Sequence, residues 1–273
     1  MKPESIFSEV NRLMNVALFI SGSGTNARKI IERSLLSDSR YKVILIFTDI
    51  RDSRTKKNGD KRCKAKDIAD EYGISYEVVD IRDFYKERGL KRTDLTIRPD
   101  FDKLVIQKID GYSVDIIALA GYMSITTKPL LDRYSGRILN VHPADLSIMD
   151  GDERKYVGIH TVRDAILAGE IELRATTHIV REKVDHGEIL VISEPVPVIL
   201  PSGVLIKDLL EDKKLMKKVV DEHQSQLKER GDWIIFPMSI QMIAEGRFAI
   251  DRERVYLDGV RLHSGYTLGL KLE

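Results

Sequence analysis

Five apolar runs of strand length alternate with segments in which apolar residues recur every three or four positions. The runs are NVALFI (15–20), KVILIF (42–47), ISYEVV (74–79), DIIALAG (115–121) and GRILNVH (136–142). The segments NARKIIERSLL, DFDKLVIQKIDGY and TKPLLDRY have helical spacing. This alternation is typical of parallel βαβ units, and runs without polar interruptions suit strands that are covered on both faces. The pattern predicts an α/β fold with a doubly wound, mostly parallel sheet.

The last quarter of the chain follows a different pattern. Beyond Pro201 the charged stretch IKDLLEDKKLMKKVVDEHQSQLKERGD predicts a solvated amphipathic helix, and WIIFPMSIQMIAEG continues the helical spacing. The segment RFAIDRERVYLDGVRL alternates around Asp258 and Gly259, a pair that favours a two-residue hairpin turn. We therefore expect C-terminal helices followed by a small β-hairpin.

These patterns predict how the chain is organised. We expect residues 1–14 to form an N-terminal extension, residues 15–200 the α/β core, and residues 201–273 a C-terminal segment packed on that core. Irregular structure is expected where charge is high and periodicity low, over 50–62, 86–99 and 143–158.

Charge, cysteine content and run length exclude several classes of protein. The 273 residues include 44 basic and 43 acidic ones, so no large positive field indicates a nucleic-acid partner. The single cysteine, Cys63, excludes an internal disulfide, and no run of eighteen apolar residues predicts a membrane span. The N-terminal MKPESIFSEVNRLMN lacks the apolar centre of a secretory signal. We expect a cytoplasmic protein that acts on small molecules. The oligomeric state is left open, a homodimer included.

A glycine-rich loop follows the first predicted strand. In SGSGTNARKII, Gly22, Gly24 and Ala27 fit the pattern G-x-G-x-x-A, and a helix is expected to begin near Asn26. The backbone N–H groups of such a loop, with the N-terminus of the helix, favour a bound phosphate. Asp49 ends the second strand and could contact a ribose, as in nucleotide-dependent dehydrogenases. A tight turn without a ligand is the purely structural alternative.

Asn140 and His142 end a later strand, at the edge of the sheet where the glycine loop is expected. Alternate residues of a strand point to one side, so this amide and this imidazole can face one substrate atom. Asp185 stands in a turn before Gly187, between two further predicted strands. Beside His142, its carboxylate would raise the pKa of the imidazole and determine which nitrogen carries the proton. A strand-end histidine and an ordinary turn aspartate are the structural alternatives.

Together these residues resemble the folate-dependent formyltransferase family. Four segments between residues 15 and 262 carry the resemblance in family order: NVALFISGSGTNARKII, DIIALAGYMSITTKPLLDRYSGRILNVHP, GIHTVRDAILAGEIELRATTHIVREKVDHGEILVISEPVPV and FPMSIQMIAEGRFAIDRERVYLDGVRL. The Asn-x-His-Pro with the later Asp-x-Gly is the specific element. The resemblance implies a Rossmann-like formyltransferase fold. It also implies transfer of a formyl group from the co-substrate 10-formyltetrahydrofolate to the amine of glycinamide ribonucleotide in purine biosynthesis, without a metal.

The resemblance implies roles for individual residues. Asn140, His142 and Asp185 match the family's catalytic trio, in which amide and imidazolium donors meet the oxyanion that forms when the amine attacks. Residues of the glycine loop match the family's phosphate-binding loop: Gly22, Ser23, Gly24, Thr25 and Asn26. The family's folate-binding wall corresponds to Tyr122, Met123, Ser124, Ile125, Thr126, Val180, Glu182 and Val184, with Arg98 aligned to an arginine near the transferred group. Asp232 aligns with a glutamate that contacts the acceptor sugar.

Several departures from the family pattern bear on the acceptor. Ser124 stands where family members usually carry an arginine, and the loop at 144–157 is longer and more charged than the proline-rich family loop. Asp232 is one methylene shorter than the family's glutamate. His160 matches a second family histidine, but a surface residue at a helix N-terminus is the structural alternative. For Arg98, which follows an insertion, the alternative is an exposed loop arginine.

Four other functions are alternatives at this point. The same trio could hydrolyse the formyl donor, although such hydrolases generally carry an N-terminal regulatory domain, for which a first strand near residue 15 leaves no room. A formyltransferase acting on methionyl-tRNA usually adds a basic C-terminal barrel, which the balanced charge and the helical tail do not suggest. A nucleotide-cofactor dehydrogenase would leave Asn140, His142 and Asp185 unexplained. A catalytically inactive relative would bind a phosphorylated metabolite without turnover.

Overall fold

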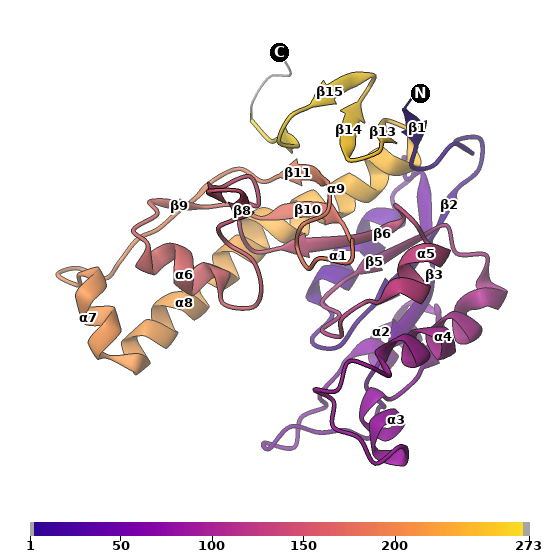
Figure 1. The fold of residues 1–273 in the computed structure, drawn as a ribbon, viewed down its shortest axis with the longest axis horizontal. Coiled ribbons are helices and arrows are strands. Elements are labelled where there is room, and N and C mark those ends of the chain that lie inside the picture. Colours follow the sequence, from indigo (N-terminus) through magenta and orange to yellow (C-terminus); the bar gives the residue numbers. More distant parts are fainter. Residues whose placement is uncertain (1–2, 270–273) are drawn as a thin grey trace.

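The computed structural model describes residues 3–269, and an eight-stranded mixed sheet lies at its centre (Figure 1). The strand order is β16-β11-β10-β6-β5-β2-β3-β4. The strands are β2 (Met14–Phe19), β3 (Tyr41–Thr48), β4 (Ser75–Val78), β5 (Ile116–Leu119), β6 (Ile138–His142), β10 (Thr176–Ile179), β11 (Ile189–Ile192) and β16 (Tyr266–Thr267). From β4 to β6 all neighbours are parallel, whereas β10 is antiparallel to both β6 and β11. The predicted α/β fold with a mostly parallel sheet is confirmed.

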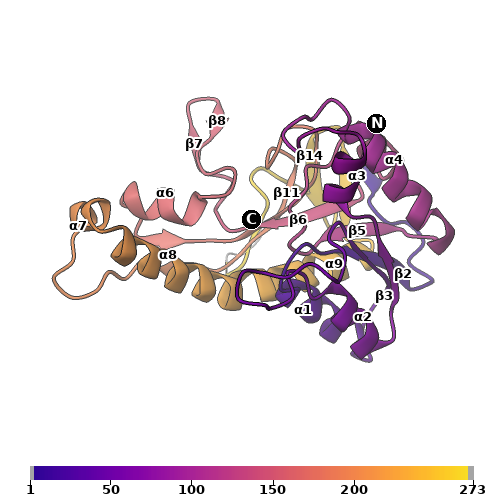
Figure 2. The ribbon, with the colours of Figure 1, turned by 90° about the horizontal axis from the view of Figure 1, so that it is seen from below.

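Helices cover both faces of this sheet. In β2, Val16 and Leu18 belong to one buried apolar cluster, and Ala17 and Phe19 belong to another. The first cluster includes α1 (Thr25–Ser34), α2 (Ala65–Tyr72) and α9 (Trp233–Ala244), and the second includes α3 (Ile81–Glu87), α4 (Arg98–Ile109) and α5 (Lys128–Arg133). In Figure 2 the sheet lies between α1 and α2 on one side and α3 and α4 on the other. The strands are apolar at successive positions because each face buries its own half of the side chains.

Two segments expected to be irregular contain regular structure. The range 86–99 includes the end of α3 and the start of α4. Helix α3 begins after Asp80, whose carboxylate accepts hydrogen bonds from the N–H groups of Arg82 and Asp83. In α4, Pro99 occupies the first turn, where its missing N–H costs nothing. The range 143–158 contains a short hairpin of β7 (Met149–Asp150) and β8 (Glu153–Arg154). The expectation of irregular structure was therefore partly wrong.

Helices α8 and α9 form one long rod with an irregularity in the middle. Helix α7 (Ile206–Glu211) precedes α8 (Lys213–Leu227), which runs through a π-helical segment η2 (Lys228–Asp232) directly into α9. The predicted amphipathic helix is confirmed in α8, where Val219, His223 and Leu227 are buried at four-residue spacing. Figure 1 shows that the α7 end of this rod, beside α6 (Thr161–Leu167), extends away from the central sheet.

The two ends of the chain meet in a second sheet. It has the order β1-β13-β14-β15 and is formed by β1 (Glu4–Ser5), β13 (Phe248–Asp251), β14 (Arg254–Leu257) and β15 (Val260–Leu262). Asp258 and Gly259 have φ angles of 51° and 84°, as the predicted two-residue turn requires. The hairpin is confirmed, but its pairing with the N-terminal extension was not predicted. Two short pairs, β9 (Glu172–Leu173) with β12 (Val196–Pro197) and β7 with β8, complete the strands among residues 3–269.

Between residues 3 and 269, none of the helices combines the length and the apolar character needed to cross a bilayer.

Replacing Phe236 by alanine is expected to lower the free energy of unfolding by about 3–5 kcal/mol. Phe236 is fully buried in the apolar cluster that joins α9 to the sheet, so its removal leaves a cavity. Ile234 lies on the same helix but is 51% exposed, and its replacement by alanine is expected to cost less than about 1 kcal/mol. Urea denaturation of both variants measures the difference, and equal losses would contradict this account.

Candidate active site

The carboxyl ends of β2, β5 and β6 meet at one edge of the sheet, as expected for neighbouring parallel strands. The glycine loop follows β2, residues 121–127 follow β5, and Asn140 and His142 end β6. Because β10 is antiparallel to β6, its residues run past the same edge in the opposite direction. This pairing places Thr176 opposite His142 and His178 opposite Asn140.

Asn140, His142 and Asp185 belong to one buried polar cluster. The His142 Nδ1 atom lies 3.5 Å from Oδ2 of Asp185. Asn140 is linked to the carboxylate through His178, whose Nε2 lies 3.3 Å from Asn140 Nδ2 and 3.6 Å from Asp185 Oδ1. Sequence reasoning missed His178. Its position in the segment ATTHIV indicated a strand, but the register that sets it opposite Asn140 is a property of the folded sheet.

Asp185 is held in an unusual backbone conformation. Its φ angle is +56°, in the left-handed region that aspartate tolerates better than most residues. Gly187, two residues later, cannot be replaced without a clash, because a Cβ atom there would lie 1.8 Å from the carbonyl oxygen of Ile179. Burial alone would raise the pKa of Asp185. The hydrogen bond with His178, the nearby His142 and the Gly158 N–H, 2.9 Å from Oδ2, together hold that pKa below its usual value. Asp185 is therefore a carboxylate at neutral pH.

His142 is 4% exposed and has an acceptor beside each ring nitrogen. Its Nε2 lies 3.1 Å from the main-chain carbonyl of Tyr156, and its Nδ1 faces Asp185. A carbonyl oxygen can only accept, so Nε2 carries a hydrogen in this arrangement. Burial lowers the pKa of His142, and the Asp185 carboxylate opposes that shift. The long loop at 144–157 thus reaches the imidazole through the backbone of Tyr156.

His178 orients the amide of Asn140. The His178 Nδ1 atom lies 2.9 Å from the carbonyl oxygen of Ile179, which only accepts, so Nδ1 carries the hydrogen. Its Nε2 faces both the Asn140 amide nitrogen, at 3.3 Å, and the Asp185 carboxylate, at 3.6 Å. Asn140 has a second amide hydrogen that this contact does not use, and it is available to a ligand.

The glycine loop has the geometry expected of an anion site. Gly24 is the N-cap of α1 with a φ angle of 69°, and a Cβ atom at this position would lie 2.3 Å from the side chain of Ile68. No side chain caps the first turn of α1. Ser23, which comes just before the N-cap residue Gly24, is exposed. Free N–H groups at a helix N-terminus are suited to bind phosphate.

Asp232 reaches the same loop from the C-terminal rod. It lies in η2 and is 4% exposed, and Asn26 Nδ2 donates to its Oδ2 over 3.3 Å. Burial raises the pKa of Asp232 to about 6, although the hydrogen bond from Asn26 opposes the shift. Within residues 3–269 no donor contacts its Oδ1. The neighbouring Gly231 allows this close packing, because a Cβ atom there would lie 2.9 Å from Cβ of Ala175.

Apolar side chains are exposed on the two loops expected to bind a pterin. Met123 is 68% exposed, Ile125 43% and Val184 53%. Glu182 is exposed beside Val184, and Val180 packs against the cluster that contains Tyr122. Exposed apolar residues on neighbouring loops suit a flat heterocycle.

The serine that replaces the family's arginine takes part in a buried network. The Ser124 hydroxyl donates to one oxygen of Asp49, and the Ser21 hydroxyl donates to the other over 2.6 Å. Asp49 is 3% exposed, and both of its carboxylate oxygens accept hydrogen bonds, so it links the loop after β2 to the loop after β5. This arrangement argues against the dehydrogenase interpretation, in which Asp49 would face a ribose.

The interpretation of Arg98 as an exposed loop arginine was wrong. Arg98 begins α4 and is 2% exposed. Its Nη1 lies 3.2 Å from Oδ1 of Asp102, and its Nη2 lies 3.4 Å from the hydroxyl of Tyr122. Asp102 also accepts two hydrogen bonds of 2.6 Å from Thr127. These contacts join α4 to the loop at 121–127, so Arg98 lies behind the expected folate wall rather than beside Asn140 and His142.

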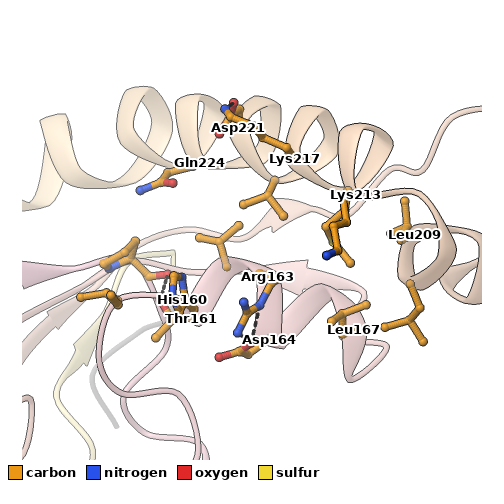
Figure 3. A pocket seen from close by; sticks show the side chains of 16 residues that line it. His160, Thr161, Arg163, Asp164, Leu167, Leu209, Lys213, Lys217, Asp221 and Gln224 are labelled. Atoms are coloured by element: carbon orange, nitrogen blue, oxygen red, sulfur yellow. Dashed lines mark hydrogen bonds and ion pairs between the residues drawn. The ribbon is translucent and has the colours of Figure 1, made fainter. Parts of the chain in front are cut away.

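A groove adjoins the cluster on the side of the C-terminal rod. It has a volume of about 620 Å³ and runs between α6 and α8 (Figure 3). Its lining includes Pro143, which is next to His142 in the chain, His160, and Lys213 and Lys217 of α8. His160 is exposed as the N-cap residue of α6, which agrees with its structural alternative. In the part of the chain that the structure describes, no three His, Cys, Asp or Glu side chains are grouped as a metal site.

Comparisons with known proteins point to one family. Residues 14–208 match the family model described as formyl transferase. The chain is 30% identical over 255 residues to phosphoribosylglycinamide formyltransferase of Haemophilus influenzae, covering 93% of this chain and 99% of that protein. It is 28% identical over 249 residues to the Escherichia coli protein of the same name, covering 91% and 96%. The solved structure of glycinamide ribonucleotide transformylase 1 from Symbiobacterium toebii is similar, with a TM-score of 0.62 and 26% identity over 92% of this chain and 96% of that chain.

Replacing Asp232 by asparagine is expected to stabilise the protein at pH 7.5 by about 2–3 kcal/mol and to have little effect near pH 4. The carboxyl has a pKa of about 6 when folded and about 3.9 when unfolded. The folded state therefore binds more protons between these values, and the stability from this group is lost as the pH rises through about 6. Asparagine has no such dependence. Denaturation at both pH values measures the effect.

The exposed Asp221→Asn on α8 is the matched control, with an expected change of less than about 1 kcal/mol at either pH. An equal effect of Asp232→Asn at pH 4 and pH 7.5 would show that its carboxyl is not perturbed.

Proposed function

This chain belongs to the formyl transferase family, and we propose that it transfers a formyl group from 10-formyltetrahydrofolate to the amine of glycinamide ribonucleotide. The product would serve purine biosynthesis. The observation that carries the proposal is the buried cluster in which His142 lies 3.5 Å from Asp185, at the strand edge that Asn140 shares with the glycine loop. Similarity to phosphoribosylglycinamide formyltransferases over most of the chain supports this choice of acceptor.

The cluster has the donors that formyl transfer requires. The acceptor amine attacks the formyl carbon, a new C–N bond forms, and the formyl oxygen becomes an oxyanion. The Asn140 amide and the protonated Nε2 of His142 donate hydrogen bonds to it. The ionised Asp185 stabilises the imidazolium. The bond from carbon to N10 of the folate then breaks, and the proton lost by the amine is delivered to N10, with Asp185 organising a proton-carrying water.

One contact must change before the imidazole can take this role. The Nε2 of His142 faces the carbonyl of Tyr156 at 3.1 Å, so that carbonyl must be displaced, or must share the hydrogen, when an oxyanion forms. The developing negative charge also counteracts the burial that lowers the pKa of His142.

The substrates are assigned to the surfaces around the cluster. We place the phosphate of the acceptor on the loop Gly22–Asn26, where the first turn of α1 offers N–H groups. Asp232 then accepts from a ribose hydroxyl through its unpartnered Oδ1, one of the buried oxygens without a partner among the described residues. We place the pteridine between Met123, Ile125 and Val184, with Ser124, Val180 and Glu182 around it and Arg98 supporting the wall through Tyr122. The expectation of a cytoplasmic enzyme without a metal or a nucleic-acid partner belongs to the same proposal.

The proposal is tested by giving purified protein 10-formyltetrahydrofolate with and without glycinamide ribonucleotide and following the loss of the formyl donor. Loss that depends on the acceptor supports the transferase. Loss without the acceptor identifies a hydrolase, and thermal stabilisation by the ligands without turnover identifies an inactive binder. Stabilisation by NAD or NADP but not by folates would favour the dehydrogenase alternative.

Replacing Asn140 by alanine is expected to lower kcat by about 10²–10³-fold, because one donor to the oxyanion is lost. The KM of either substrate should change much less, since the interaction strengthens only in the transition state. Steady-state kinetics with the folded variant measures both. Asn58→Ala, which removes an exposed amide from the loop after β3, should keep full activity. An Asn140→Ala enzyme with more than a tenth of the original kcat would exclude this role.

A further inference from the structure

Arg154 contacts the loop that carries Asp185, although it lies 31 positions earlier in the chain. Its Nη1 donates to the carbonyl oxygen of Asp185 at 2.5 Å, and its Nη2 donates to the carbonyl oxygen of Gly187 at 2.9 Å. Both acceptors are main-chain atoms. The guanidinium therefore leaves the carboxylate of Asp185 to His142 and His178, whereas an ion pair with that carboxylate would compete with them.

The two hydrogen bonds act on a conformation that the loop does not favour by itself. Asp185 has a positive φ angle, and residues 182–184 just before it are exposed. A backbone in the left-handed region persists when surrounding contacts determine it. The planar guanidinium suits this purpose, because its fixed N–H directions bind two carbonyl oxygens at once. Burial also lowers the pKa of Arg154, and the nearby carboxylates of Asp185 and Glu188 oppose this shift.

Neighbouring residues of the same hairpin contact the same loop. The Glu153 carboxylate pairs with Lys183 and, at 2.9 Å, with Nε2 of His186. Beyond the hairpin, the Gly158 N–H donates to Oδ2 of Asp185 itself. The segment 153–158 thus contacts the loop before, at and after Asp185. Residues 153–157 belong to the loop at 144–157, whose length and charge depart from the family pattern.

We propose that Arg154 is a positioning residue for Asp185. Through the carbonyl oxygens of Asp185 and Gly187, it holds the loop so that the carboxylate stays within reach of His142 and His178. The kinetic consequence rests on the proposed function, whereas the structural consequence, an ordered loop at 180–188, does not. The hairpin β7–β8 is in this view part of the active-site framework.

Arg154→Ala is expected to lower kcat about tenfold, because a catalytic group displaced by a fraction of an ångström loses much of its effect. The KM for glycinamide ribonucleotide should change by less than about twofold, since the phosphate loop lies elsewhere. Arg154→Lys should give an intermediate kcat, because an ammonium group does not reproduce the two-pronged contact. Lys155→Ala removes the next cation of the hairpin, whose partner is Glu170, and should keep the original activity.

A double-mutant cycle distinguishes positioning from general destabilisation. In an Asp185→Asn background the carboxylate to be positioned is already gone, so Arg154→Ala should cost less than about twofold further in kcat. An equal tenfold loss in both backgrounds would overturn the proposal, and so would an unchanged kcat in the single variant.

Hydrogen exchange tests the contact independently of the reaction. Amides of residues 180–188 should exchange at least several-fold faster in Arg154→Ala than in the original protein or in Lys155→Ala. Unchanged exchange there would overturn the proposal. If the original protein shows no acceptor-dependent turnover, the proposed function fails, and the exchange experiment alone decides whether Arg154 orders the loop.

Discussion

The antiparallel pairing of β10 with β6 is the contact on which the site depends. The other strand pairs of β5 and β6 are parallel, so the carboxyl ends of β2, β5 and β6 lie at the same edge of the sheet. Reversing β10 sets His178 against Asn140 and returns the chain to the same edge at Asp185. A shift of one residue in this register would turn His178 to the opposite face of the sheet. The cluster of amide, imidazoles and carboxylate is thus a consequence of strand register.

Burial and charge oppose each other in this cluster. Burial lowers the pKa of His142, and by itself it would raise the pKa of Asp185. The carboxylate keeps its charge because His178 and the Gly158 N–H face it. Two main-chain groups of one long loop, the Tyr156 carbonyl and the Gly158 N–H, therefore take part in the electrostatics of the site. An insertion in the family pattern has become part of the site's environment.

Two residues that depart from the family pattern, Ser124 and Asp232, make other contacts in this structure. Ser124, where the family usually has an arginine, joins the buried Asp49 and links two loops. Asp232 is a shorter side chain than the family's glutamate, and it lies in a π-helical segment of the rod. Such segments displace side chains from the regular helical positions and are frequent at functional sites. Gly231 lets that part of the rod approach β10 closely enough for Asp232 to meet Asn26.

The sequence by itself determined the α/β class, the glycine loop, the hairpin at Asp258 and Gly259, and the residues Asn140, His142 and Asp185 as candidates. These features follow from residue spacing, turn-forming residues and the ends of strands, all of which depend on residues close together in the sequence. Only the tertiary structure decided that His178 joins the cluster, that Arg98 is buried against Tyr122, that β1 pairs with β13, and that Arg154 contacts the Asp185 loop. These depend on register and packing between segments far apart in the chain, and no local pattern encodes which of many distant partners a side chain will meet.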